Sequence, residues 1–219
     1  MGLGRREFLK LTSIISTGFL INPFKAVITN NDTYLNKKLG IAFNKPPGWY
    51  FLNMKDFGDL EDKQVFQLDV ENINEVEWDD NDPICVITKY DNESKSNDGR
   101  FSPAIVVDAT PKSIYEELGV ENFEEFVKSS EYNTSKILKK YKVIKRYAPY
   151  EIYGVKTYEV DIRYIFEHQD LKRGFTAEYK SIKFEHNHLY YEINMHFSSF
   201  QNEYAEPEYR NFIKSIKLL

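Results

Sequence analysis

The sequence has 219 residues, a length that favours one domain and leaves ample chain for a hydrophobic core. A formal net charge of −5, with basic residues scattered along the chain, gives no general attraction to nucleic acid, while 16 Tyr and 16 Phe favour a sheet-rich core. The single cysteine, Cys85, excludes an intramolecular disulfide and a cysteine-rich metal site.

Residues 1–26 have the pattern of an export leader. A basic start precedes an apolar stretch at 11–21, which is shorter and more polar than the roughly 20 apolar residues that span a bilayer. The start resembles a twin-arginine translocation signal, and the residues that carry this likeness are Arg5, Arg6, Phe8, Leu9 and Lys10. The resemblance implies that the twin-arginine translocase exports the folded protein to a bacterial periplasm. An ordinary secretory signal is the alternative interpretation.

The end of the leader is less well defined. Phe24-Lys25-Ala26 only partly follows the small-x-small rule for signal cleavage, so cleavage after Ala26 and retention of the leader both stay open. A retained leader would tether the protein loosely to the inner membrane, without a stable transmembrane span. Residues 27–38 are polar and we expect a linker there, followed by one domain at 39–219.

The first half of this domain combines short strands with a helical region. Pro and Gly at 46–48 predict a turn between the first two strands. The apolar stretches that predict strands are 39–43, 49–52, 84–90 and 102–108. Ser113 and Glu116 have the spacing of a capping box, which predicts a helix that begins there. Gly119 should interrupt it, and a second helical segment should bury Phe123, Phe126 and Val127.

The second half changes to alternation of apolar and polar residues. From about residue 135 this period of two indicates strands with one buried face, typical of an antiparallel meander. The expected turns are 149–154, 168–174 and 186–188. The segment 207–219 predicts a terminal helix with one apolar face, made of Tyr209, Phe212, Ile213 and Ile216.

The order of elements therefore indicates an α+β fold, an antiparallel β-sheet meander sandwiched between helices. It resembles the PsbP/DcrB-like family over roughly 39–219. The segments that carry the resemblance are 40–43 with 47–49, 103–107, 121–129, 154–158 and 212–216. An acid-rich segment between Asp56 and Asp82 departs from the family pattern. The resemblance implies an α/β/α sandwich and a largely non-enzymatic role, since some members are extrinsic subunits of photosynthetic membrane complexes and others are exported proteins of unclear role.

Two groups of residues are weak candidates for a metal site. Asp79, Asp80 and Asp82 offer the oxygen ligands that Ca²⁺ prefers, but they lack the spacing of an EF-hand. His186 and His188 flank an expected turn, where exposed histidines are common. A solvated acidic loop and ordinary turn histidines are the simpler interpretations, so we expect neither a metal nor a cofactor.

The other two histidines should not join them. His188 and His196 lie about 26 Å apart along one strand at about 3.3 Å per residue, and the meander places His168 beside His196 at that far end. The sequence also lacks a Gly-x-Ser-x-Gly elbow and a glycine-rich phosphate loop, so no catalytic residue is assigned.

These features lead to one main hypothesis and two alternatives. We expect an exported, non-catalytic envelope domain that binds a partner protein or small ligand as an accessory factor. One alternative is a metal-dependent or hydrolytic envelope enzyme that uses the acidic segment and the histidines. Another is a structural subunit whose sheet docks on a membrane complex.

Overall fold

A computed structural model describes residues 27–29, 32–52, 64–65, 83–90, 101–169, 171–199 and 202–219. The twin-arginine motif and the acidic candidates Asp79, Asp80 and Asp82 lie outside the described residues, so the expectations about them stay predictions.

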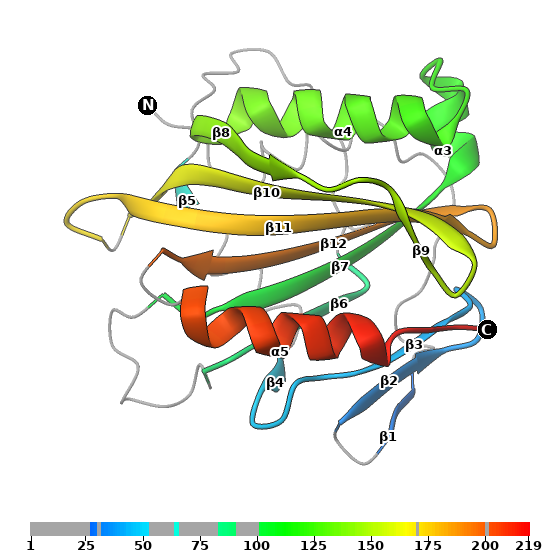
Figure 1. Cartoon of the computed structure of the whole chain (residues 1–219), viewed down its shortest axis with the longest axis horizontal. Coiled ribbons are helices and arrows are strands. Elements are labelled where there is room, and N and C mark those ends of the chain that lie inside the picture. Colours follow the sequence, from blue (N-terminus) through cyan, green and yellow to red (C-terminus); the bar gives the residue numbers. More distant parts are fainter. Residues whose placement is uncertain are drawn as a thin grey trace.

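The main body is a nine-stranded antiparallel sheet, on which helices are few (Figure 1). Its path of neighbouring strands is β4 (Tyr50–Leu52), β6 (Cys85–Thr88), β7 (Ala104–Pro111), β12 (Leu189–Ser198), β11 (Phe175–His186), β10 (Val155–His168) and β5 (Gln64–Val65). Two more strands, β8 (Lys139–Arg146) and β9 (Tyr150–Ile152), also pair with β10. The long hairpins β10–β11 and β11–β12 confirm the predicted meander.

A smaller sheet includes two strands in the segment where we expected a linker. Its order is β1 (Val27–Thr29), β2 (Thr33–Asn36), β3 (Ile41–Asn44) and β13 (Lys217–Leu218). The expectation of a linker over 27–38 is wrong for both strands in it. The Asn36 side chain accepts hydrogen bonds from the backbone N–H groups of Lys38 and Leu39, both 3.1 Å long, and this closes the turn that folds β2 onto β3.

The helices also differ in detail from the prediction. Helix α3 (Lys112–Glu117) begins after Pro111 without a side-chain cap, so the predicted capping box is wrong. The side-chain cap is found instead on α4 (Phe123–Ile137), where Asn122 accepts from the backbone N–H of Glu125 over 3.0 Å. Helix α5 (Asn202–Ser215) begins earlier than expected, and the chain ends in β13 rather than in a helix.

Helices α4 and α5 cover opposite faces of the meander (Figure 1). Side chains alternate between the two faces along each strand. On one face Glu192 accepts from Ser130 of α4, and on the other Glu159 accepts from Arg210 of α5. The predicted apolar face of the terminal helix is buried, with Tyr209 and Phe212 at most 1% exposed.

Among the described residues, no helix is both long enough and apolar enough to cross a membrane.

Candidate functional site

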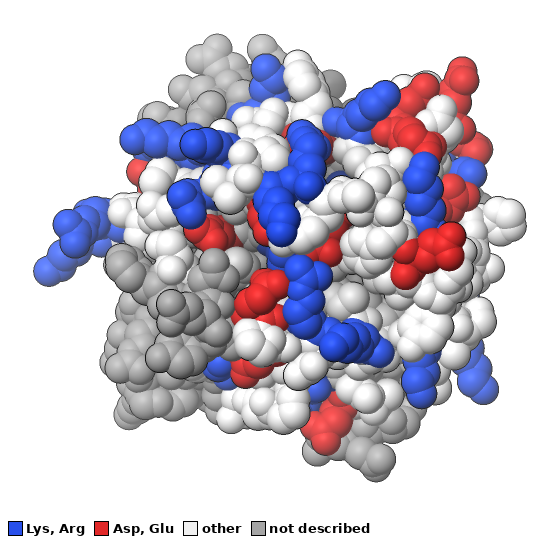
Figure 2. Space-filling view, viewed as in Figure 1, with Lys and Arg blue, Asp and Glu red and all other residues white. Residues whose placement is uncertain are grey.

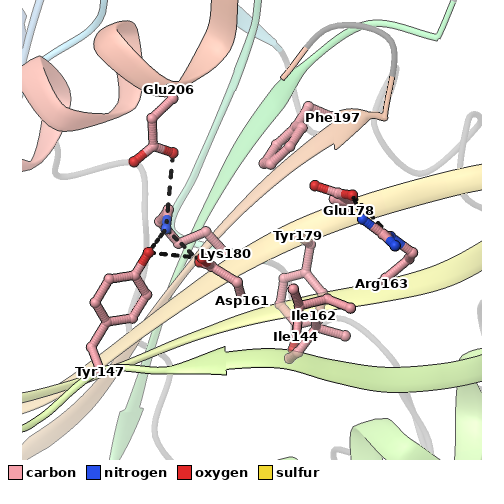
Figure 3. A pocket seen from close by; sticks show the side chains of 10 residues that line it. All are labelled: Ile144, Tyr147, Asp161, Ile162, Arg163, Glu178, Tyr179, Lys180, Phe197 and Glu206. Carbon is pink, nitrogen blue, oxygen red and sulfur yellow. Dashed lines mark hydrogen bonds and ion pairs between the residues drawn. The ribbon is translucent and has the colours of Figure 1, made fainter. Parts of the chain in front are cut away.

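A cavity of about 320 Å³ lies beside the start of α5, over the middle of β10 and β11. Figure 3 shows its ten lining side chains, which come from five elements and the connection after β8. They are Ile144, Tyr147, Asp161, Ile162, Arg163, Glu178, Tyr179, Lys180, Phe197 and Glu206. The lining is therefore polar and apolar in about equal parts, with apolar surface from Ile144 on β8 and Phe197 on β12.

The register of the β10–β11 hairpin places opposite charges across from each other. Asp161 lies opposite Lys180, and Arg163 lies opposite Glu178 two residues farther along the strand. Directly opposed residues share one face of an antiparallel sheet, with their Cβ atoms about 5 Å apart. Arg163 donates to Glu178 through Nε over 2.9 Å and through Nη2 over 2.5 Å.

Lys180 is the buried centre of the charge network, with a side chain only 3% exposed. Its Nζ donates to Asp161, to Glu159 Oε1 over 3.0 Å and to the Tyr147 hydroxyl over 3.3 Å. Glu206 Oε2 lies farther away, at 3.9 Å. Burial acts to lower the pKa of Lys180, but the hydrogen bond and charge of Asp161, followed by those of Glu159, raise the pKa above its ordinary value.

The carboxylate of Glu159 pairs with the buried ammonium group of Lys180. Glu159 lies two residues before Asp161, on the same face of β10, and its side chain is 1% exposed. Arg210 donates to both of its carboxylate oxygens, over 2.9 and 3.2 Å, and the Tyr150 hydroxyl donates over 2.8 Å. Burial acts to raise the pKa of Glu159, but the hydrogen bonds from Arg210, Tyr150 and Lys180 outweigh it and lower the pKa. Glu159 and Lys180 therefore stay ionised around neutral pH.

Tyr147 connects the network to the cavity. Its hydroxyl donates to Asp161 Oδ2 over 2.8 Å and accepts from Lys180. Three cations surround its ring, with Lys145 Nζ at 4.1 Å, Lys180 Nζ at 4.8 Å and the Arg210 guanidinium carbon at 5.6 Å from the ring centroid. These cation–π contacts and two hydrogen bonds fix the ring and its hydroxyl together.

A separate buried pair lies on the face that α4 covers. Lys183 Nζ is 2.8 Å from Glu192 Oε1, and Glu192 also accepts from Ser130 and Asn194 over 2.7 and 3.1 Å. Burial acts to raise the pKa of Glu192, but Lys183 and these hydrogen bonds lower it. The pair ties α4 to the sheet and does not line the cavity.

The histidines predicted as weak metal candidates lie at the β11–β12 turn. His186 packs against Gly40, where a Cβ would lie 3.0 Å from His186 Nε2, and the left-handed φ of 61° at His188 belongs to the turn. His196 stacks on Tyr179, and His168 stacks on Phe166. Within the described residues, no group of three or more His, Cys, Asp or Glu side chains is arranged to hold a metal ion.

The cavity residues were missed by the sequence analysis, although a signal for them exists. Glu159, Asp161 and Arg163 alternate with apolar residues in the sequence, a pattern typical of the solvent-facing side of a strand. The charges pair when the chain folds back with Phe166 opposite Phe175, one residue earlier than an even fold at the predicted turn of 168–174 would place them, so the order of charges is the signal and the turn alone does not fix the pairing.

Comparisons with known proteins give no family assignment. No protein-family model matches the chain, and no curated protein matches its sequence. Similar solved structures include cyanobacterial PsbP (CyanoP) from Synechocystis sp., with a TM-score of 0.47 and 9% identity over 94% of this chain and 100% of that one.

Two further structures show the same degree of likeness. LpqN, involved in cell envelope biogenesis of Mycobacterium tuberculosis, has a TM-score of 0.47 and 10% identity over 81% of this chain and 82% of its own. A protein of unknown function from Pseudomonas aeruginosa has a TM-score of 0.46 and 14% identity over 70% of this chain and 95% of its own. With TM-scores below 0.5, these likenesses do not establish a shared activity.

Proposed function

We propose that this chain is an exported, non-catalytic accessory protein of the PsbP-like type that binds a small polar molecule in the cavity over β10 and β11. The observation that carries the proposal is the set of hydrogen bonds and ion pairs that hold the polar side chains at the cavity in place. Lys180 and Arg163 each contact carboxylates, and the Tyr147 hydroxyl is held between Lys180 and Asp161. Such prearranged polar groups bind a ligand with little loss of side-chain entropy.

The size and lining of the cavity indicate the class of ligand. Its volume of about 320 Å³ falls at the lower end of small-molecule sites, which span about 300–1,000 Å³. Asp161 and Glu206 side chains are 28% and 37% exposed and keep free lone pairs, because a carboxylate accepts about four hydrogen bonds. Phe197 and Ile144 add apolar surface. A compact molecule with both donors and acceptors, such as an amino acid or a hexose, matches this lining.

The same electrostatics favour binding over acid–base catalysis. A general acid or base works best when its pKa lies near the operating pH. The network moves the pKa of Glu159 down and the pKa of Lys180 up, so both groups move away from neutrality. The alternative of a metal-dependent or hydrolytic enzyme, with Asp79, Asp80, Asp82, His186 and His188, instead predicts turnover of a substrate, with a bound metal in the metal-dependent case. Elemental analysis of the purified protein and assays on a substrate panel test that alternative.

Location in the envelope follows from the leader. Arg5 and Arg6 motivate export by the twin-arginine translocase to the periplasm, where an accessory factor can contact envelope proteins.

The test is a ligand screen on the full chain with the standard amino acids and hexoses as probes. Saturation-transfer NMR identifies any probe that binds, and calorimetry then measures its affinity. We expect Tyr147→Phe to weaken binding about tenfold, because it removes a hydroxyl placed by two charged partners. Tyr153→Phe is the control, since Tyr153 is 62% exposed and does not line the cavity. Binding by none of the probes, or an equal effect of both variants, contradicts the proposal.

A further inference from the structure

Strand β8 concentrates positive charge that the sequence analysis described as scattered. Its eight residues, Lys-Lys-Tyr-Lys-Val-Ile-Lys-Arg, include five cations. Lys139 pairs with Glu167 over 2.7 Å, and Arg146 pairs with both oxygens of Glu131. The other three, Lys140, Lys142 and Lys145, are exposed and form no ion pair within the part of the chain that the structure describes.

These lysines, of which Lys145 also lies over the ring of Tyr147, flank an exposed apolar side chain on the outer part of the sheet. Lys142 lies opposite Arg163 and Lys145 opposite Asp161, so both lie on the cavity side of the sheet. Ile144 is 44% exposed between them. Figure 2 shows Lys and Arg side chains gathered over β8 and the adjacent sheet. We name Lys140, Lys142, Ile144 and Lys145 the β8 basic strip.

The backbone of β8 is a poor template for an added strand. Its pairing with β10 contains two register shifts, and Lys140 has a left-handed φ of 54°. Such irregularities interrupt the regular row of hydrogen-bonding groups that a partner strand would need. Any partner of the strip is therefore recognised by its side chains.

We infer that the β8 basic strip attaches this protein to an anionic phospholipid surface. Arg146, next to the strip, and Arg163, opposite Lys142, are occupied by Glu131 and Glu178, so the strip cations without an ion pair are all lysines. A lysine ammonium group is a flexible point charge and lacks the planar guanidinium group with which arginine makes two hydrogen bonds to one phosphate. Lysines therefore suit a diffuse layer of anionic headgroups. An apolar side chain among basic residues can enter the headgroup boundary.

Nucleic acid is the competing polyanion, but the arginines beside the strip that could bind its phosphates, Arg146 and Arg163, are occupied by Glu131 and Glu178. The simplest competing explanation is that lysines on an edge strand only prevent aggregation between sheets. That explanation predicts no affinity for membranes. The strip borders the cavity through Ile144, but attachment to a membrane requires no small ligand, so the two proposals are tested by separate measurements.

The test is vesicle co-sedimentation of the full chain. The probes are vesicles of phosphatidylcholine with one quarter phosphatidylglycerol and vesicles of pure phosphatidylcholine. The test variant is Lys140→Gln with Lys142→Gln and Lys145→Gln. Its matched control carries the same charge change at exposed lysines on or next to the smaller sheet, with Lys37→Gln, Lys214→Gln and Lys217→Gln. Residues 1–26 are identical in all three proteins, so the difference between variants isolates the strip.

We expect the parent to bind the anionic vesicles in a salt-sensitive manner. Each strip lysine should contribute about fivefold to the affinity, so the test variant should lose about a hundredfold while the control loses much less. Equal melting temperatures of the three proteins verify folding. The inference is overturned if the parent ignores anionic vesicles or if both variants lose affinity equally. It is also overturned if polyglutamate or duplex DNA at equal charge binds the strip more tightly than the vesicles do.

Discussion

Replacement of Lys180 with Met should expose the energetic role of the buried network most clearly. Met keeps an unbranched apolar stem and removes the ammonium group, which leaves Glu159 and Asp161 without their shared cation. Removal of one partner from a buried ion pair costs about 3–5 kcal/mol, because a charge is left uncompensated. Here Glu159 retains Arg210 and Tyr150, and Asp161 is partly exposed to water. We therefore expect the lower end of that range, about 3 kcal/mol.

Urea unfolding at neutral pH measures this loss through tryptophan fluorescence, to which Trp49, 1% exposed in the native protein, contributes along with Trp78. For a chain of this size, about 3 kcal/mol corresponds to a fall in Tm of about 6–12 °C. Lys214→Met is the control, an exposed substitution that should change the free energy of unfolding by less than about 0.5 kcal/mol. If Lys180→Met lowers the free energy of unfolding by less than about 1 kcal/mol, the buried network does not stabilise the fold as we infer.

Three further predictions test other parts of the molecule. Because the pKa of Glu159 is lowered from 4.5, its stabilisation is present above that pH and is lost as the pH falls through the native pKa. Glu159→Gln should therefore flatten the loss of stability in acid, as measured by urea unfolding down to about pH 3. Lys183→Met should cost about 3 kcal/mol in the same assay, and Glu192→Leu added to it should restore part of the loss. Arg5→Lys with Arg6→Lys should retain the protein in the cytoplasm on cell fractionation, whereas unchanged export would indicate an ordinary secretory signal.

The parts of the fold predicted correctly depend on local periodicity. Alternation along β10 and β12 predicted the buried face of the meander, and the spacing of Tyr209 and Phe212 predicted the buried face of α5. Both patterns are set by side chains on one element, so they are visible before any packing is known.

The charge network was not predictable in the same way. Glu159 alternates with apolar neighbours as a solvent-facing residue would, but α5 covers that face and supplies Arg210 from 51 positions away in the sequence. The linker prediction for 27–38 failed for a related reason, because its polar residues form β2 only through pairing with β3. The β8 basic strip was missed because charge was judged over the whole chain instead of within one strand.

Native mass spectrometry of the full chain purified from the cell envelope shows whether the cavity holds a ligand. We expect a small organic molecule bound to the parent protein and a large loss of its occupancy in Tyr147→Phe, with Tyr153→Phe unchanged. A protein that carries no small molecule, or one whose occupancy is the same in all three proteins, would contradict binding in the cavity over β10 and β11.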